Sequence, residues 1–319
     1  MAVLVTGAGG FLGPEIIDRV LASGKEVLAF DFADPKPESL EKWKGKVEFI
    51  QGDVRDRSMV NYLLKRSGTE DPVIHLAGIL TAGCDRDPNM AIAVNINGLN
   101  NILDAAVNNG NRRTVFASTI GVYGRGLPQP IKEDMPAEPD GWYGFTKLMG
   151  EHMGLLYERR HGLDFRAARF AAVTGPFRQA AGSASLFTSH IAEKPALGEA
   201  YEVEVSEDTA YPVVYLKDAA DALFQIAFAE KAPSRIYNVS SGRVIVSEMI
   251  KAVKKIIPDA KYTFKPDPVI MAVVEGYKEW NISTDRISKE LGWTPTYTPD
   301  EMVKDIIKVV QNKVKSKKK

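Results

Sequence analysis

Cysteine is almost absent from this 319-residue sequence, which has only Cys84 together with four histidines. A single cysteine cannot form an internal disulfide, and this fits a reducing compartment. The sequence also lacks a run of about 18 apolar residues, the length that spans a membrane. Residues 1–5 lack the charged start of a signal peptide. We therefore expect a cytoplasmic protein that does not bind a membrane, and we predict no metal site.

An excess of charge of either sign is also lacking. The 41 Lys and Arg residues balance the 41 Asp and Glu residues, so no general field attracts nucleic acid. The hydrophobic fraction of 45% is ordinary for a globular protein. No internal repeat or low-complexity linker divides the chain, so we expect two lobes of one continuous unit. The expected partner is a small-molecule substrate.

A glycine-rich turn follows the first apolar run, residues 3–6. Its glycines have the spacing G-x-x-G-x-x-G, and an amphipathic helix comes next. Strand, glycine turn and helix together predict a dinucleotide site, because the backbone can approach a pyrophosphate and the helix start offers free N–H groups. A plain βα turn is the alternative. The predicted contacts in this turn are Gly7, Gly10, Phe11, Leu12 and Gly13.

An acidic residue ends the second apolar run, residues 27–30. This residue, Asp31, stands 18 positions after Gly13, close to the spacing expected for an acid that binds the adenosine ribose. A carboxylate there accepts hydrogen bonds from both ribose hydroxyls and repels a 2′-phosphate. We therefore favour NAD over NADP, with a turn residue at the strand end as the alternative.

Two further apolar runs end in small or hydroxylated residues. Residues 73–78 end in Ala77 and Gly78, and residues 114–119 end in Ser118 and Thr119. Small residues at the carboxyl end of a strand let a ligand lie against the backbone. Within the first of these runs we predict that His75 is a core residue, because its neighbours are apolar.

Tyr143 and Lys147 stand four residues apart in a segment expected to be helical. On a helix this spacing places both side chains on one face. A nearby cation favours phenolate, which would help a tyrosine to act as a base at neutral pH. The pattern alone is weak, since chance often produces it, and its value depends on the nucleotide site upstream.

Four features occur in one order along the chain: Thr6-Gly7-x-x-Gly10-x-x-Gly13, Asp53-Val54, Ser118-Thr119 before Val122-Tyr123-Gly124, and Tyr143-x-x-x-Lys147. Together they resemble the extended short-chain dehydrogenase/reductase family over essentially the whole chain. The resemblance implies an α/β fold with a doubly wound parallel sheet of the Rossmann type, bound NAD, and a smaller C-terminal substrate-binding lobe.

The family also implies a catalytic set of Thr119, Tyr143 and Lys147, in which the lysine lowers the pKa of the tyrosine. Ser118 is the alternative hydroxyl, because a shift of one residue along a strand reverses the face of each side chain. Asn95 is expected to reach backbone near the nicotinamide. The further implied cofactor contacts are Asp53, Val54, Leu76, Ala77, Gly78, Asn95, Ala117, Ser118, Tyr143, Lys147, Phe170 and Val173.

The resemblance further implies a division of the chain. The NAD-binding lobe takes residues 1–170 with a returning strand near 212–240, which we place around Val213. The substrate-binding lobe takes residues 171–211 and 241–319. The family's usual dimer surfaces correspond to helices 91–109 and 143–160, so we expect a homodimer.

The C-terminal half departs from the pattern of nucleotide-sugar enzymes of this family. Ala172 and Tyr211 stand where those enzymes carry an Asn and an Arg for the diphosphate. Buried phosphates need charged donors, so we expect a small substrate without a diphosphate. Residues 206–215 instead resemble the short-chain type of L-threonine dehydrogenase, although aldonate and uronate dehydrogenases also lack the phosphate partners.

The candidate substrate contacts are Thr81, Thr119, Tyr143, Thr174, Ser183 and Trp280. Arg178 has the chemistry to bind a carboxylate, but we predict a surface side chain. The sequence therefore favours an NAD-dependent oxidoreductase that takes a hydride from the secondary alcohol of a small polar substrate, such as an L-threonine-like hydroxy-amino acid, an aldonate or a uronate. A nucleotide-sugar epimerase or dehydratase with tightly bound NAD and a non-catalytic NAD(H)-binding sensor are the alternatives.

Overall fold

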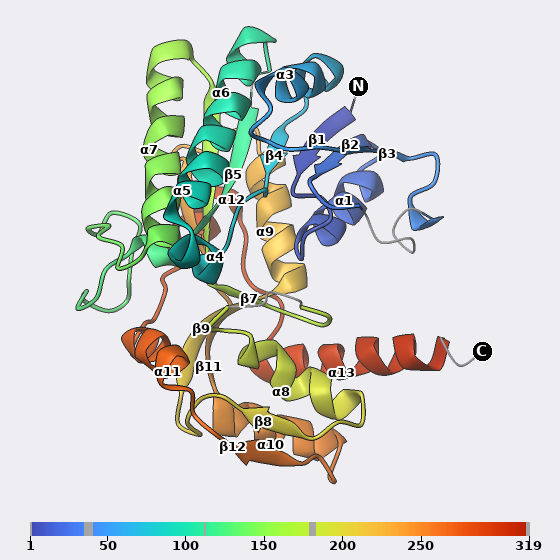
Figure 1. Ribbon diagram of the computed structural model, residues 1–319, viewed down its shortest axis with the longest axis vertical. Coiled ribbons are helices and arrows are strands. Elements are labelled where there is room, and N and C mark those ends of the chain that lie inside the picture. Colours follow the sequence, from blue (N-terminus) through green and yellow to red (C-terminus); the bar gives the residue numbers. More distant parts are fainter. Residues whose placement is uncertain (1, 35–40, 112, 179–182, 317–319) are drawn as a thin grey trace.

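The computed structural model describes residues 2–34, 41–111, 113–178 and 183–316. Figure 1 shows two parts, one above the other: the upper part holds a large sheet between helices, and the lower part holds short strands and helices. None of the helices in these ranges is both long enough and apolar enough to cross a membrane.

The large sheet has seven parallel strands in the order β10-β6-β5-β4-β1-β2-β3. The order reverses between β1 and β4, which is the switch point where doubly wound sheets bind ligands. The predicted fold class is therefore confirmed. The strands are β1 (Ala2–Thr6), β2 (Glu26–Asp31), β3 (Val47–Gln51), β4 (Val73–His75), β5 (Arg113–Thr119), β6 (Asp164–Phe170) and β10 (Ile236–Val239).

Helices cover both faces of this sheet (Figure 1). On one face α3 (Arg57–Arg66) packs against α6 (Leu99–Asn108), which packs against α7 (Trp142–His161). On the other, α1 (Gly13–Ala22) packs against α9 (Leu216–Phe228). Because both faces are covered, central strands are apolar without alternation, as in the fully buried Val3, Leu4 and Val5 of β1.

The helix expected over residues 91–109 is present but is not uniform. It runs from α5 (Pro88–Ala91) through the π-helical η1 (Ile92–Gly98) into α6. A π-helical turn inside a helix often marks a functional site. Here it carries the buried Asn95, whose contacts belong to the site described below.

The strand that returns to the large sheet is not the one expected around Val213. That segment is β9 (Ala210–Tyr215), which lies in a separate sheet between β7 (Ala172–Thr174) and β11 (Gly242–Ile245). The strand that joins the large sheet is β10, beside β6. All six residues of β9 are buried. Because a strand buried on both faces is apolar in whichever sheet it lies, the sequence could not show to which sheet this strand belongs.

A second hydrophobic core lies in the lower part. It is formed by α8 (Phe187–Ala196), α10 (Val246–Ile256) and α13 (Pro299–Ser316), with β8 (Tyr201–Val203) paired to β12 (Tyr262–Phe264). The remaining short elements are α4 (Thr81–Arg86), η2 (Ile120–Val122), α11 (Pro268–Val274), η3 (Glu275–Tyr277) and α12 (Asp285–Leu291).

Glycines bring α7 close to the sheet. A Cβ atom built on Gly144 would lie 2.0 Å from the Gly121 carbonyl oxygen, and one on Gly154 would lie 2.2 Å from the Phe165 ring. Any side chain at these positions would force the helix outward. Close packing at Gly144 therefore fixes the start of α7, with Tyr143, against the end of β5.

We predict that Gly154→Ala destabilises the fold. Alanine normally stabilises a helix by about 1 kcal/mol relative to glycine, but overpacking here should cost about 1–3 kcal/mol because the new Cβ meets Phe165. Chemical denaturation should show a net loss of stability. His152→Ala, at an exposed position on the same helix, is the control, and a more stable Gly154→Ala variant would contradict the packing argument.

Candidate active site

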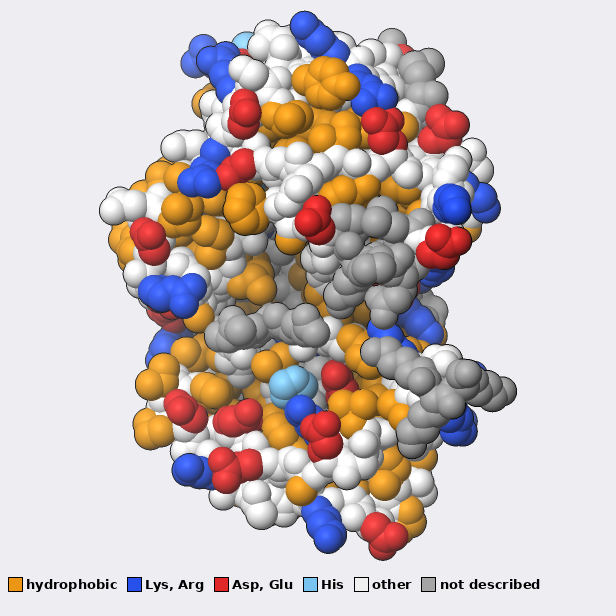
Figure 2. Space-filling model, turned by 45° about the vertical axis from the view of Figure 1, so that its right-hand side comes forward, with side chains coloured by type: hydrophobic (Ala, Val, Ile, Leu, Met, Phe, Trp, Pro, Cys, Tyr) orange, Lys and Arg blue, Asp and Glu red, His pale blue; other side chains and the backbone are white. Residues whose placement is uncertain are grey.

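A cavity of about 330 Å³ lies at the carboxyl ends of the parallel strands. Its walls come from the glycine turn, from the ends of β4, β5 and β6, and from segments of the lower part that include Arg178, Tyr211 and Tyr277. Figure 2 shows that the molecule is hollowed between its upper and lower parts, with hydrophobic side chains along the hollow. This cavity is the candidate active site.

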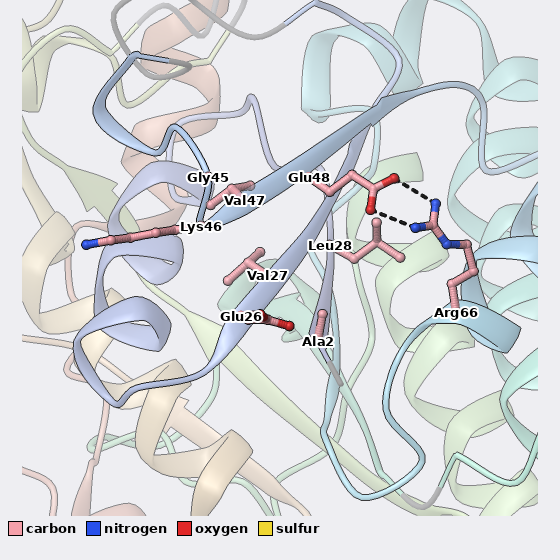
Figure 3. Close-up of a pocket in the computed structure, with 9 residues that line it drawn as sticks. All are labelled: Ala2, Glu26, Val27, Leu28, Gly45, Lys46, Val47, Glu48 and Arg66. Carbon is pink, nitrogen blue, oxygen red and sulfur yellow. Dashed lines mark hydrogen bonds and ion pairs between the residues drawn. The ribbon is translucent and has the colours of Figure 1, made fainter.

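A larger hollow of about 530 Å³ lies at the opposite, amino ends of β1, β2 and β3 (Figure 3). Its rim carries an ion pair between Arg66 and Glu48 at 2.7 Å, and both side chains are well exposed. Ligands of open parallel sheets bind beyond the carboxyl ends of the strands. Position in the fold therefore favours the smaller cavity.

The glycine turn has the shape that a dinucleotide needs. Gly7 has a φ of 71°, and a Cβ on it would lie 2.6 Å from the Ala77 nitrogen. A Cβ on Gly13 would lie 2.2 Å from the Ala8 carbonyl oxygen. The start of α1 has no side-chain cap, so its N–H groups can receive a phosphate. The residues present fit a bound dinucleotide.

Asp31 ends β2 beside this turn. Its Oδ2 accepts a hydrogen bond from the Gly9 N–H at 2.9 Å, and its Oδ1 accepts one from the Ala33 N–H at 3.0 Å. The carboxylate is therefore held at the strand end where an adenosine ribose would lie. Asp53 pairs with Arg55 and Val54 packs against Gly98; neither belongs to the cavity wall.

Most of the other predicted cofactor residues do line the cavity. Asn95 instead holds the adjoining loop: its Oδ1 accepts from the Ile79 N–H at 2.7 Å, and its Nδ2 donates to the Ile79 carbonyl at 3.0 Å. Ala77 lies directly behind Gly7. The lining residues among those predicted are Gly7, Gly10, Phe11, Leu12, Gly13, Leu76, Gly78, Ala117, Ser118, Tyr143, Lys147, Phe170 and Val173.

Tyr143 and Lys147 project into the cavity from the first turns of α7. Lys147 Nζ donates to the Ala117 carbonyl at 2.8 Å and lies 4.6 Å from the centre of the Phe116 ring and 5.7 Å from that of Tyr143. Burial lowers the pKa of Lys147 to about 8. Burial raises the pKa of Tyr143, and the charge of Arg178 opposes that rise.

The two hydroxyls at the end of β5 have different surroundings. Ser118 Oγ donates to Glu151 Oε1 at 2.5 Å, and this carboxylate is also bound by Arg169 at 2.7 Å. Thr119 Oγ1 accepts a hydrogen bond from the Gly121 N–H at 3.1 Å and borders the cavity. Because Ser118 is committed to a buried ion pair, the geometry favours Thr119 as the hydroxyl available to a substrate.

Two of the predicted substrate contacts lie elsewhere. Thr174 Oγ1 bonds to Thr188 Oγ1 at 2.8 Å inside the fold. Trp280 is buried with its ring 4.5 Å from that of Tyr277, and it is Tyr277 that borders the cavity. An indole this deep in the core supports the wall without forming it. Thr81 and Ser183 do line the cavity, together with Thr119 and Tyr143.

The prediction that Arg178 is a surface side chain is wrong. Arg178 is only 9% exposed and lines the cavity. Its guanidinium donates to the Ser185 carbonyl at 3.1 Å and to Ser183 Oγ at 3.0 Å. Burial lowers its pKa to about 10, so it stays charged at neutral pH. The cavity therefore contains two cations, Arg178 and Lys147.

No acid balances these cations among the lining residues that the structure describes. Residues 179–182 of the sequence contain none either. No sequence motif indicated that Tyr277 and Ser185 line the cavity. The sequence did point to Tyr211, because it stands where the nucleotide-sugar enzymes of the family carry an Arg for the diphosphate.

His75 and Cys84 are core residues. His75 is fully buried, its Nδ1 lies 2.7 Å from Thr6 Oγ1, and burial lowers its pKa to about 3. The prediction of a core histidine is confirmed. The Cys84 thiol is buried and donates to the Ile79 carbonyl at 3.2 Å.

The sequence pattern of the NAD dependent epimerase/dehydratase family matches residues 3–240. The chain belongs to this family. This confirms the expected resemblance, and the chain is an NAD-dependent enzyme.

Relatives of this family member include dehydrogenases and epimerases. It is 29% identical to the mitochondrial L-threonine 3-dehydrogenase of Bos taurus over 94% of this chain and 80% of that protein. It is 28% identical to an uncharacterized epimerase/dehydratase of Staphylococcus saprophyticus over 98% of both. Among solved structures, Thermus thermophilus UDP-glucose 4-epimerase in complex with NAD matches with a TM-score of 0.83 and 27% identity, covering 98% of this chain and 99% of that one.

We predict that Lys147→Met changes how stability depends on pH in the NAD-free protein. The lysine pKa is about 8 when folded and 10.5 ordinarily, so between these values the unfolded chain binds more protons. Wild-type stability should therefore rise with pH relative to the variant across that interval. Unfolding measured at a series of pH values checks this. If the difference in stability between wild type and variant does not change with pH, burial does not lower the pKa of Lys147.

Proposed function

We propose that this enzyme is an NAD-dependent dehydrogenase that oxidises the secondary alcohol of a small substrate bearing a carboxylate. The observation that carries the proposal is the buried Arg178, whose charge acts on Tyr143 across the cavity. Among the described residues, the hydrogen-bond partners of this guanidinium are Ser183 and Ser185 and include no acid, and a buried guanidinium of this kind is suited to a bidentate carboxylate. The phosphate partners of nucleotide-sugar enzymes are replaced by Ala172 and Tyr211, which supports a substrate without a diphosphate.

In this proposal NAD supplies the hydride acceptor, and the chain supplies position and proton transfer. Tyr143 as phenolate accepts the proton of the substrate hydroxyl, and Thr119 Oγ1 donates a hydrogen bond to the same oxygen. Because burial raises the pKa of Tyr143, the phenolate needs nearby positive charge, and the charge of Arg178 opposes the rise. The Lys147 ammonium lies 5.7 Å from the centre of the Tyr143 ring. Arg178 holds the substrate carboxylate and so fixes the carbinol carbon.

Within this class, an L-threonine-like hydroxy-amino acid is one candidate and an aldonate or uronate is the other. The relatives named L-threonine 3-dehydrogenase support the first. A nucleotide-sugar epimerase is the second candidate function, because proteins titled UDP-glucose 4-epimerase share the fold. A non-catalytic NAD(H) sensor is a weaker candidate, since it need not keep Thr119, Tyr143 and Lys147 together.

A spectroscopic assay separates these functions. We expect the protein to reduce added NAD with one or more of L-threonine, related hydroxy-amino acids, aldonates or uronates. The epimerase alternative predicts tightly bound NAD and conversion of a UDP-sugar without added cofactor. Turnover of a UDP-sugar, with no reduction of NAD by any of these carboxylates, would contradict the proposal.

We predict that Tyr143→Phe lowers kcat by about 10²–10⁴-fold, the range for loss of a general acid–base group. The affinity for NAD should be nearly unchanged, because only a hydroxyl is removed. NAD-reduction kinetics and a NAD titration check the two effects separately. Tyr62→Phe, at an exposed tyrosine, is the matched control, and activity of Tyr143→Phe close to wild type would reject Tyr143 as the acid–base group.

Asp31→Ala should relax the preference for NAD over NADP. The ratio of kcat/KM for the two cofactors should fall by about 10-fold or more, the loss expected for charge-assisted hydrogen bonds together with relief of repulsion. Asp34→Ala, in the turn that follows, is the control. An unchanged ratio would remove Asp31 from the ribose site.

We also propose a homodimer through helices 91–109 and 143–160. Along α7 the apolar side chains Phe145, Met149 and Leu156 are 42%, 38% and 44% exposed, and their spacing places them on one face of the helix. Light scattering at micromolar concentration should give the mass of two chains, and Met149→Glu should reduce it. A monomeric mass for the wild-type protein would reject this proposal.

A further inference from the structure

Arg178, on the cavity wall, ends a turn of residues 174–178 that is held by side chains of α8. Thr188 bonds to Thr174, and Ser189 Oγ accepts a hydrogen bond from the Gly175 N–H at 3.2 Å. One helical turn further on, Glu193 Oε2 accepts a hydrogen bond from the Phe177 N–H at 2.9 Å. Three side chains of one helix thus hold this turn, two of them through its backbone N–H groups.

Phe177 adopts a strained backbone conformation. Its φ of 60° lies in the left-handed region, which side chains with a Cβ rarely adopt. Such strain persists only where the surroundings enforce it, and it is concentrated at functional sites. Two contacts enforce it here: the hydrogen bond to the buried Glu193 carboxylate and the Lys313 ammonium of α13, which lies 4.7 Å from the centre of the Phe177 ring.

The conformation of Phe177 sets the direction in which the next residue leaves the turn. That residue is Arg178, whose guanidinium lies 6.0 Å from the centre of the Phe11 ring in the glycine turn and is bound to Ser183 and Ser185. If the backbone at Phe177 relaxed to a negative φ, the side chain of Arg178 would start from a different direction. The guanidinium would then no longer be held over the cavity.

We propose that Glu193 is a positioning residue for substrate recognition: it stabilises the left-handed Phe177 and thereby aims Arg178 at the substrate carboxylate. The inference rests on the proposed function, in which Arg178 binds that group. Glu193 does not line the cavity, so its effect passes through the backbone of the turn. A glutamine can replace its acceptor, because the side-chain carbonyl also accepts an N–H.

The test uses Glu193→Ala, Glu193→Gln, Arg178→Met and the double variant Arg178→Met/Glu193→Ala. The probes are the carboxylate substrate most active in the NAD-reduction assay and the carboxamide of the same acid. Glu193→Ala should raise KM for the carboxylate by about 10-fold, within the range of coupling between neighbouring residues. The change in kcat, in KM for NAD and in kcat/KM for the carboxamide should each be less than about 2-fold.

Two comparisons decide whether Glu193 acts through Arg178. In the Arg178→Met background, Glu193→Ala should add little, because there is no guanidinium left to position. Glu193→Gln should restore most of the wild-type KM. Equal losses for the carboxylate and carboxamide, additive losses in the double variant, or failure of Glu193→Gln to restore KM would overturn the proposal.

A second measurement does not depend on turnover. Hydrogen exchange of the peptide over residues 174–178 should speed up in Glu193→Ala and stay near wild type in Glu193→Gln. If Glu193→Ala does not fold, the same substitution is made together with Phe177→Gly, because glycine adopts a positive φ without a Cβ penalty. There Glu193→Ala should leave KM close to that of Phe177→Gly alone, and a rise of about 10-fold would overturn the proposal. If exchange is unchanged in Glu193→Ala, the positioning role of Glu193 is wrong even if the enzyme is a dehydrogenase. If exchange is altered but the protein oxidises no alcohol that bears a carboxylate, only the proposed function is rejected.

Discussion

The site depends on the close approach of α7 to the end of β5. This approach is possible because Gly144 faces the carbonyl of Gly121, in η2 directly after β5, without a side chain between them. The same contact places Tyr143 of the helix and Thr119 of the strand on one cavity. Further along α7, Gly154 packs against the Phe165 ring. The packing that stabilises the upper part is therefore also what assembles the proposed proton-transfer pair.

Charge gives the cavity its second constraint. Lys147 and Arg178 are buried cations, and burial lowers the pKa of each. The carboxylate of Glu151 lies nearby but is bound by Arg169 and Ser118. A substrate that brings its own negative charge offsets the cost of burying these cations. This balance is the physical reason to propose a carboxylate substrate on a fold that also serves enzymes titled UDP-glucose 4-epimerase.

Local pattern was enough to predict the geometry of the glycine turn and of the strand and helix ends around it. The glycine turn, Asp31 and the Tyr143–Lys147 pair depend on spacing within single strands and helices, and the structure places them where that spacing requires. The choice between Ser118 and Thr119 could not be made from sequence, because neighbouring strand residues face opposite ways and only the packing of Glu151 shows which face is buried.

The substrate half depends on tertiary packing that pattern does not show. Arg178 is buried among contacts with Ser183 and Ser185, which the sequence pattern did not indicate. Trp280 and Tyr277 are aromatic residues three positions apart, and only the fold decides which borders the cavity. The strand that returns to the large sheet could not be distinguished from β9, since both are short and mostly apolar and buried.

The most direct test of the central claim is to follow the hydrogen on the carbinol carbon. The protein is incubated with excess NAD and with L-threonine, an aldonate or a uronate deuterated at the carbon to be oxidised, and free reduced NAD is analysed by mass spectrometry. The account predicts one deuterium in each released reduced cofactor, matched by one oxidised carboxylate product. Label that never reaches free cofactor, with a deuterated UDP-sugar epimerised instead, would contradict it.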